Sequence, residues 1–214
     1  MNHKKIRRIM AKYDLTCQVR RKNPYKQIMK KTQEHRTLEN ILDRNFNQTT
    51  PRKVLCTDIT YLYYGSLGRK AFLSAVKDIA SGETLTWQTS QNLELGFVLR
   101  TIDQLKKLEL LSGCLIHSDQ GFHYTNPLYQ QKIKQLSIIQ SMSRKGNCID
   151  NAPMESFFGH LKDEVDFKSC DSFSKVTIKI NEYMKYYNHQ RCQWELKKMT
   201  PIQYRDHLLA EKSA

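Results

Sequence analysis

Residues 54–65 read VLCTDITYLYYG, a run of β-branched and aromatic residues that stops at a glycine. This composition is typical of a β-strand bounded by a turn. Two similar runs follow, KAFLSAVKDIA at 70–80 and ETLTWQTS at 83–90, with turn signals at 65–68 and 81–82 between them. Because short turns join consecutive strands in hairpins, the three runs predict an antiparallel meander.

Strand and helix patterns alternate after the meander. Residues 92–111 carry apolar side chains at helical spacing, which predicts an amphipathic helix that ends before Gly113. Alternation of strands with helices favours parallel pairing, so the predicted class is α/β, with a mixed sheet flanked by helices. The remaining predicted elements are a strand at 114–121, a helix at 127–136, a strand at 137–143 and helices at 153–167 and 172–188.

The composition describes a folded and strongly basic chain. Of 214 residues, 39% are hydrophobic and 10% aromatic, enough for one sizeable domain with an appendage. Lys and Arg number 35 against 21 Asp and Glu, and the net charge of +14 favours a polyanionic partner. No run approaches the ~20 apolar residues of a membrane helix, and the N-terminus lacks the apolar segment of a signal peptide. We therefore expect a cytoplasmic chain with no membrane partner.

Cysteine spacing argues against a metal knuckle. The six cysteines lie at positions 17, 56, 114, 148, 170 and 192, and no two are spaced as zinc ligands. Disulfide frameworks are typical of short secreted chains. We expect reduced thiols that are mostly buried.

The positive charge is concentrated at the N-terminus. Residues 1–53 hold 15 Lys or Arg against 4 Asp or Glu. Apolar residues at helical spacing in 1–30 predict a small basic helical arm, and 31–53 reads as a polar linker. One interpretation is a solvated, frayed tail. The other is a DNA-binding arm that adds salt-dependent affinity without choosing a sequence, through Lys4, Lys5, Arg7, Arg8, Arg20, Arg21 and Lys22.

Three acidic residues lie where packing alone does not account for them. Asp58 interrupts a β-forming run, although Asp is depleted in strands. Asp119 follows the apolar run at 114–116, where an α/β sheet presents groups at the end of a strand, but a turn residue there is also common. Glu155 lies in the first turn of its helix, a position that equally suits a carboxylate compensating the helix dipole. Taken singly, none of the three identifies a site.

Longer motifs in a fixed order accompany the acids: TDIT at 57–60, HSDQG at 117–121, SMSRKGN at 141–147, DNAPMESFF at 150–158, YNHQR at 187–191 and Thr200-Pro201. With these motifs the chain resembles the integrase-core transposases of bacterial insertion sequences, specifically the family called insertion sequence three, whose second reading frame encodes the catalytic part. The resemblance extends over essentially the whole chain.

The resemblance implies a ribonuclease H-like core over 54–165, a C-terminal helical extension over 166–214, and Asp58, Asp119 and Glu155 as a catalytic and metal-binding Asp-Asp-Glu triad. Hard divalent cations take oxygen ligands, so Mg²⁺ or Mn²⁺, as two ions, is the expected cofactor. The implied reaction is cleavage of a DNA strand by water, followed by attack of the freed 3′-hydroxyl on another phosphodiester. The implied partners are double-stranded DNA, at terminal inverted repeats and at a target, and further copies of the chain, on the nucleoid of a bacterial cytoplasm.

The resemblance also implies residues that contact DNA. Lys162 lies two helical turns after Glu155 on nearly the same face, where the family carries a basic residue that contacts the DNA end. A solvated surface lysine is the alternative. The polar loop before this helix suits contacts with phosphates, and a merely flexible loop is its alternative. The loop residues in question are Arg144, Lys145, Asn147 and Asn151.

Other polar and aromatic residues are assigned to packing. Tyr61 and Tyr63 share one face of a strand, and core packing is favoured there over a base-stacking surface. His117 and His123 flank Asp119 and stay outside the catalytic set. The signature at 187–191 is assigned to packing against the core.

Two departures from the family pattern leave other functions open. Leu55 stands where most relatives have Trp, and the sequence begins part-way through a helix-turn-helix-like segment, so repeat recognition is expected to be partial or to involve an upstream-frame protein. One rival function is a truncated, catalytically silent transposase that binds DNA as a repressor. Another is a ribonuclease H-type nuclease without strand transfer. The 35 residues between Asp119 and Glu155 favour the transposase over the nuclease.

Overall fold

The computed structural model describes residues 2–15 and 36–213. The chain divides into two compact units, Met1–Glu34 and His35–Ala214. In the first unit the described part is a basic helix, α1 (His3–Lys12), whose first turn is capped by the Asn2 side chain. The predicted arm is therefore helical in this part.

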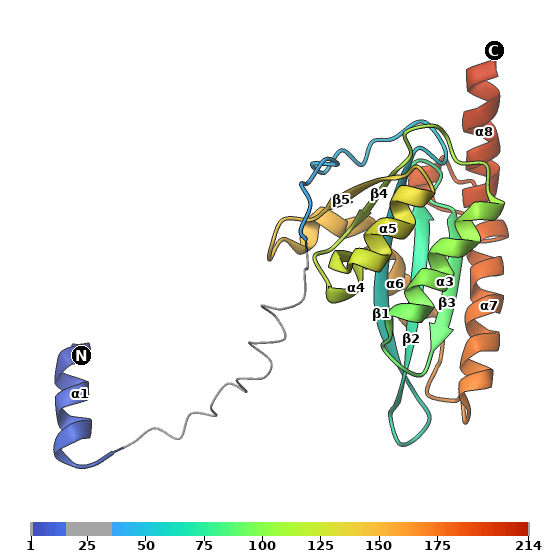
Figure 1. Ribbon diagram of the computed structural model, residues 1–214. Helices are drawn as coiled ribbons and strands as arrows, with labels where there is room; N and C mark the ends of the chain where they lie inside the picture. Colours follow the sequence, from blue (N-terminus) through green and yellow to red (C-terminus); the bar gives the residue numbers. More distant parts are fainter. Residues whose placement is uncertain (1, 16–35, 214) are drawn as a thin grey trace. The chain divides into compact units, whose positions relative to one another are not determined.

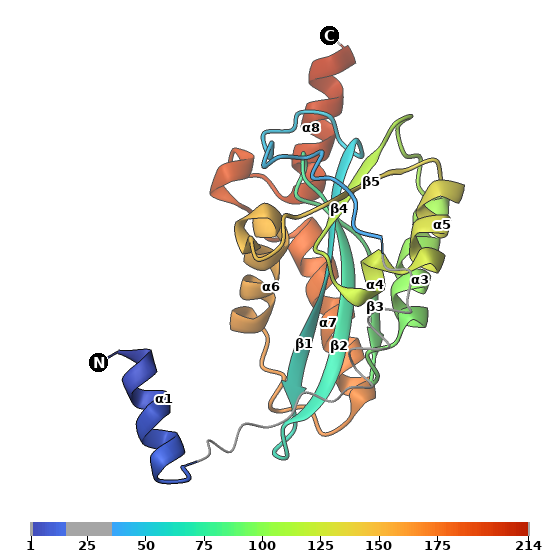
Figure 2. The same ribbon diagram turned by 60° about the vertical axis from the view of Figure 1, so that its left-hand side comes forward.

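The second unit is built on a five-stranded mixed sheet in the order β3-β2-β1-β4-β5 (Figures 1 and 2). Consecutive strands β1, β2 and β3 pair antiparallel, which confirms the predicted meander. The later strands pair parallel, β4 to β1 and β5 to β4, as the alternation with helices predicts. The strands are β1 (Val54–Tyr64), β2 (Arg69–Asp78), β3 (Thr84–Ser90), β4 (Leu115–Ser118) and β5 (Ile139–Met142).

The two neighbours of β1 differ in length. β2 pairs with it from Leu55 to Tyr64, whereas β4 pairs only with Val54–Cys56. Beyond Cys56 no other strand in the described residues pairs with this side of β1. The second half of β1 is therefore an edge.

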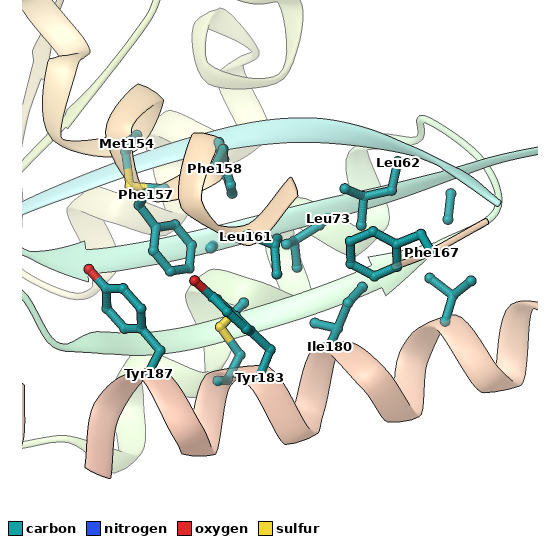
Figure 3. Packing of buried hydrophobic residues seen from close by; sticks show 14 of the residues in the cluster. Leu62, Leu73, Met154, Phe157, Phe158, Leu161, Phe167, Ile180, Tyr183 and Tyr187 are labelled. Carbon is teal, nitrogen blue, oxygen red and sulfur yellow. The ribbon is translucent and has the colours of Figure 1, made fainter. Parts of the chain in front are cut away.

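Helices cover both faces of the sheet. Helices α3 and α5 lie on one face, and α6 and α7 on the other (Figures 1 and 2). Figure 3 shows Phe157 and Leu161 of α6 and Tyr187 of α7 directed toward the strands. The helices are α3 (Leu95–Asp103), α4 (Phe122–Thr125), α5 (Pro127–Gln135), α6 (Ala152–Glu164), α7 (Phe173–His189) and α8 (Pro201–Ser213), with 3₁₀ turns η1 (Gln104–Lys107), η2 (Cys148–Asn151) and η3 (Trp194–Leu196).

Helix ends follow local chemistry. Asn126 caps α5 by accepting the Leu128 amide, and Pro127 occupies the first helical position. The α-helix predicted over 92–111 is shorter. Residues 92–94 are not helical, with Glu94 extended, and after Asp103 the chain tightens into a 3₁₀ turn, as is common at helix ends.

Residues 36–53, assigned to a linker from the sequence, lie on the second unit. The amides of Ile41 and Leu42 donate to Ser141 Oγ at 2.9 and 3.1 Å, and the Leu42 side chain is buried. The amide of Met142 on β5 donates to the carbonyl of Glu39 at 3.2 Å. This stretch therefore runs along the edge of the sheet formed by β5, and we call residues 36–45 the strap.

Cys56, Cys114 and Cys170 are buried free thiols, and Cys192 is an exposed one. No helix in residues 2–15 and 36–213 has both the length and the apolar character to cross a membrane.

Candidate active site

Asp58 and Asp119 are brought together by the parallel pairing of β1 with β4. In that pairing Cys56 lies opposite His117. Asp58 lies two residues after Cys56, within β1, and Asp119 lies two residues after His117, directly after the end of β4. The strand register therefore explains why residues 61 positions apart lie on one edge.

The loop after β4 positions the carboxylate of Asp119. Its Oδ1 accepts the Gly121 amide at 2.8 Å. A Cβ at Gly121 would lie 2.8 Å from the same oxygen, closer than such contacts occur. Gln120 anchors the loop by donating to the Ser143 carbonyl at 3.0 Å. The absence of a side chain at Gly121 therefore lets Asp119 keep its position.

Glu155 comes from the first turn of α6, on the face of the sheet covered by that helix. Asn151 joins the start of α6 to β1, since its Nδ2 donates to the Thr57 carbonyl at 3.3 Å, one residue before Asp58. Asp58, Asp119 and Glu155 all line one open cavity of about 490 Å³.

The cavity concentrates negative charge. Burial, and after it the charge of Asp119, raise the pKa of Asp58 to about 7. Glu155 acts in the same direction, while the Ile59 amide and Lys162 oppose it. The three carboxylates therefore interact electrostatically, and a bound cation would relieve their repulsion.

The donor set fits a hard cation. Carboxylate oxygens are what Mg²⁺ and Mn²⁺ take, with water and phosphate oxygens completing the shell. Asn151 also lines this cavity, and its buried Oδ1 accepts no hydrogen bond from the described residues. Within those residues no three His, Cys, Asp or Glu converge closely enough to hold a metal as they stand.

Arg144 is exposed and lines the cavity, but its guanidinium is already bound within the protein, and Asn151 is buried. Asn151 is 4% exposed. The Arg144 guanidinium forms two 3.0 Å hydrogen bonds to the carboxylate of Asp150, whose side chain is fully buried. Asp150 also accepts from Arg44 Nε at 2.6 Å and from Asn40 of the strap at 3.1 Å. Asp150 thus joins the strap to the loop before α6, a role that sequence reasoning missed.

Lys145 and Asn147 are exposed and line the cavity, as a phosphate contact requires. Lys162 is near enough for its charge to lower the pKa of Asp58, and its Nζ lies 5.2 Å from the Tyr61 ring centroid. Of the arm residues, Lys4, Lys5, Arg7 and Arg8 are exposed on α1. Arg20, Arg21 and Lys22 lie outside the described residues.

His117 is structural, in keeping with its exclusion from the catalytic set. It is buried between Ser141 Oγ at 2.9 Å and Ser143 Oγ at 3.0 Å. Ser141 Oγ already accepts two strap amides, so its own proton goes to His117 Nδ1. Burial lowers the pKa of His117 to about 4, which keeps the ring neutral. His123 is buried too.

The expectation that Tyr61 and Tyr63 pack in the core is wrong. Both rings are half exposed, at 52% and 50%. Their face of β1 does carry core residues such as Leu55, but the helices on that face stop short of the edge. Strand alternation predicts which face a side chain takes, not whether another element covers it.

The C-terminal signature has an identifiable structural role. Asn188 pairs with the backbone of Thr84, accepting its amide at 2.9 Å and donating to its carbonyl at 2.8 Å. The Tyr187 ring packs edge-to-face on Phe157 of α6 at 4.9 Å. The helix α7 is thereby fixed to both β3 and the helix that carries Glu155.

Comparisons with known families agree with this architecture. Two models described as an integrase core domain match residues 48–148 and 155–209. The InsK transposase of insertion sequence element IS150 from Escherichia coli (strain K12) is 38% identical over 96% of this chain and 72% of its own length. A transposase-like protein of Haemophilus influenzae is 35% identical over 96% of this chain and 93% of its own.

Solved structures with the same fold are retroviral integrase cores. The catalytic core of BIV integrase gives a TM-score of 0.58 at 19% identity, covering 76% of this chain and 99% of its own. The HTLV-2 integrase core in complex with magnesium gives 0.55 at 16% identity, covering 73% and 97%.

The fold is thus ribonuclease H-like, and with the family match it defines an integrase-type polynucleotidyl transferase. The chain belongs to the integrase-core transposases of insertion sequence elements, in the family called insertion sequence three.

Proposed function

We propose that the chain catalyses metal-dependent cleavage and strand transfer at the ends of an insertion sequence, with Asp58, Asp119 and Glu155 as the triad that holds Mg²⁺ or Mn²⁺. The observation that carries this proposal is the shared cavity, into which three separate segments bring one carboxylate each. Carboxylate oxygens are the ligands that these cations take in proteins.

Bound in pairs, divalent ions stabilise the attacking and leaving oxygens of an in-line displacement at phosphorus. The chain's own contribution is to hold the ligands. The Gly121 amide orients Asp119, and the Ile59 amide, 2.7 Å from Asp58 Oδ1, orients Asp58. Lys145 and Asn147 offer donors to the phosphates of the strand.

No covalent intermediate with the protein is required. Water attacks the phosphodiester at the element end, the bond to the 3′-oxygen breaks, and that oxygen leaves as a hydroxyl. The 3′-hydroxyl then attacks a second phosphodiester, which expels another 3′-oxygen. One site serves both steps, because the same change takes place at phosphorus each time.

The proposal extends to the partners. The chain acts on double-stranded DNA at terminal repeats and at a target, as a homo-oligomer, on the nucleoid in the cytoplasm. The basic arm supplies sequence-independent affinity, and an upstream-frame protein completes repeat recognition.

The test is incubation of the purified chain with end-labelled duplex that carries the terminal repeat of its own element, in Mg²⁺, Mn²⁺ or EDTA. We expect nicked and joined strands only with metal, and neither product from Asp58→Asn, Asp119→Asn or Glu155→Gln. Glu182→Gln, an exposed acid on α7, is the matched control and should remain active.

Binding affinity and circular dichroism are measured on the same samples. Triad variants that bind DNA and fold normally but do not cleave support the metal site. Loss of activity that follows unfolding in all three refutes it. Binding by the wild type without any strand change favours the repressor, and hydrolysis without joining favours the nuclease.

A further inference from the structure

Tyr61 and Tyr63 form an exposed aromatic pair on the edge of β1. Their ring centroids are 5.4 Å apart in an edge-to-face arrangement. Among the described residues no strand pairs with β1 here on the side of β4, and both rings are exposed. Contiguous exposed apolar surface is a mark of a ligand-binding or interaction site.

Lysine side chains lie against both rings. Lys70 Nζ is 5.8 Å from the Tyr61 centroid and 5.5 Å from that of Tyr63, and Lys162 reaches Tyr61 from α6. These distances are in the range of cation–π contacts. Aromatic rings among lysines are the usual composition of a surface that stacks bases while cations bind the flanking phosphates.

A cavity of about 600 Å³ opens beside the rings, within the size range of small-ligand sites. Its lining includes Tyr61, Tyr63 and Lys162 together with Asp163 and Asp166. Carboxylates repel phosphate but accept hydrogen bonds from the amino groups of bases. The cavity therefore suits a flat, uncharged group rather than the DNA backbone.

The aromatic pair is close to the triad. A smaller cavity of about 160 Å³ is lined by Asp58, Asp119 and Tyr61 together. Along β1, Tyr61 lies three residues from Asp58, about 10 Å at the rise of a strand and on the opposite face, so the two residues meet only around the open edge, where this cavity lies. A strand whose phosphodiester lies at the triad can thus place a neighbouring base at Tyr61.

We propose that Tyr61 and Tyr63 bind an unpaired nucleobase of the DNA end, next to the phosphodiester held at the triad. This inference rests on the proposed function and adds the state of the DNA to it: the duplex is opened at the site of reaction. Taking a base out of its stack costs free energy, and stacking on Tyr61 offsets that cost.

The test compares two duplexes of the element's terminal repeat, one fully paired and one with its last three bases mismatched, each carrying 2-aminopurine at the end. Binding is measured in Ca²⁺, which takes oxygen ligands like Mg²⁺ but in looser geometry. With Tyr61→Leu we expect roughly tenfold weaker binding of the opened duplex, and under about twofold change for the paired one. The 2-aminopurine should be quenched by the wild type and stay bright with the variant.

Tyr61→Phe keeps the ring and should restore binding and quenching. Tyr186→Leu, an exposed tyrosine on α7 outside this cavity, is the matched control and should behave as wild type. Equal affinities of Tyr61→Leu and wild type for both duplexes, or failure of Tyr61→Phe to rescue, would overturn the inference. So would a change in oligomeric state by Tyr63→Leu with DNA binding intact, because the surface would then contact protein.

Cleavage of the paired duplex by the wild type distinguishes failure of the base site from failure of the proposed function. If the wild type cleaves and joins but the tyrosine variants bind the opened duplex normally, only the base site is wrong. If the wild type does not cleave in any metal, the proposed function fails first.

Discussion

Arg191 donates hydrogen bonds to Glu164 through two nitrogens of its guanidinium. Its Nε and Nη2 lie 2.9 and 2.7 Å from Glu164 Oε1, just after the end of α7 and at the last residue of α6. Both side chains are largely shielded, and Tyr183 OH donates to the same carboxylate at 3.2 Å. The helix that carries Glu155 is therefore held at both ends, by Asn151 at its start and by Arg191 at its finish.

Replacing Arg191 by Lys should destabilise the protein by about 1 kcal/mol, because a lysine cannot form the two-nitrogen contact. Urea unfolding monitored by circular dichroism measures the change. Lys175→Ala, which removes an exposed pair with Asp171, is the control and should leave the midpoint unchanged. If both variants lost the same free energy of unfolding, the Arg191 contact would contribute no more than an exposed ion pair.

Gly121→Ala should lower the cleavage rate by about 100-fold with little effect on folding, since a misplacement of about 1 Å at a reacting centre has an effect of that size. The added Cβ collides with Asp119 Oδ1, the end of a side chain that can move, so the carboxylate is displaced rather than the backbone. Gly96→Ala on α3 adds a methyl at ordinary contact distance and should be fully active. A fully active Gly121→Ala would show that Asp119 need not stay in this position.

Asp150→Asn should destabilise the chain by roughly 2 kcal/mol at neutral pH, because a buried carboxylate bound by charged donors is replaced by a neutral amide. Hydrogen bonds from Arg144, and then from Arg44, hold the pKa of Asp150 well below its usual value. The native state thus binds the proton less readily than the unfolded state. The ionised Asp150 carboxylate therefore stabilises the fold fully above the pKa of this group in the unfolded chain, near 3.8, and this stabilisation is lost as the pH falls below that value.

Unfolding free energies of both proteins between pH 7 and pH 2 check this dependence. The difference between wild type and Asp150→Asn should be constant down to about pH 4 and shrink below it. A difference that grows on acidification would contradict the sign. Asp163→Asn, an exposed acid on α6, supplies the baseline.

Asn188→Ala should cost roughly 2–4 kcal/mol, because it leaves the buried amide and carbonyl of Thr84 without partners. Calorimetric unfolding gives the value. Asn181→Ala on the same helix removes one exposed hydrogen bond, from Trp87, and should cost well under half as much. Similar losses would mean that Asn188 acts only through helix propensity.

Removal of residues 1–30 should weaken DNA binding and flatten its dependence on salt. Each phosphate contact contributes about 0.9 to the slope of log affinity against log salt concentration. Filter binding over a range of KCl concentrations measures that slope. The same slope with and without the arm would contradict its proposed role.

Much of the fold follows from local patterns. The meander could be predicted because β-branched runs and turn residues alternate at short spacing, and the parallel pairing because helices intervene. The nearness of Asp58 to Asp119 also requires β4 to pair with β1 in the observed register, which local patterns do not predict. The grouping of the three acids in one site was implied by the family resemblance. The position of Glu155 depended on the family resemblance, since a carboxylate in the first turn of a helix has a structural explanation as well.

Other features depend on tertiary coverage, which periodicity does not encode. The exposure of Tyr61 reflects where the neighbouring helices and β4 stop, not its own strand pattern. The partners of Asp150 come from a stretch more than 100 residues away that reads as a polar linker. The sequence does not show that Arg144 is bound by Asp150, six residues later in the same loop.

Beyond Cys56, one side of β1 is an open margin of the sheet in the isolated chain, with no pairing strand among the described residues. Its backbone groups there are therefore a template for a strand from another molecule. The segment TYLYY at 60–64 is uncharged and β-prone. The lysines over the tyrosine rings are the charges that discourage such pairing. High salt screens those charges and also releases DNA. The protein should therefore aggregate most readily in the very buffers used to strip nucleic acid from it.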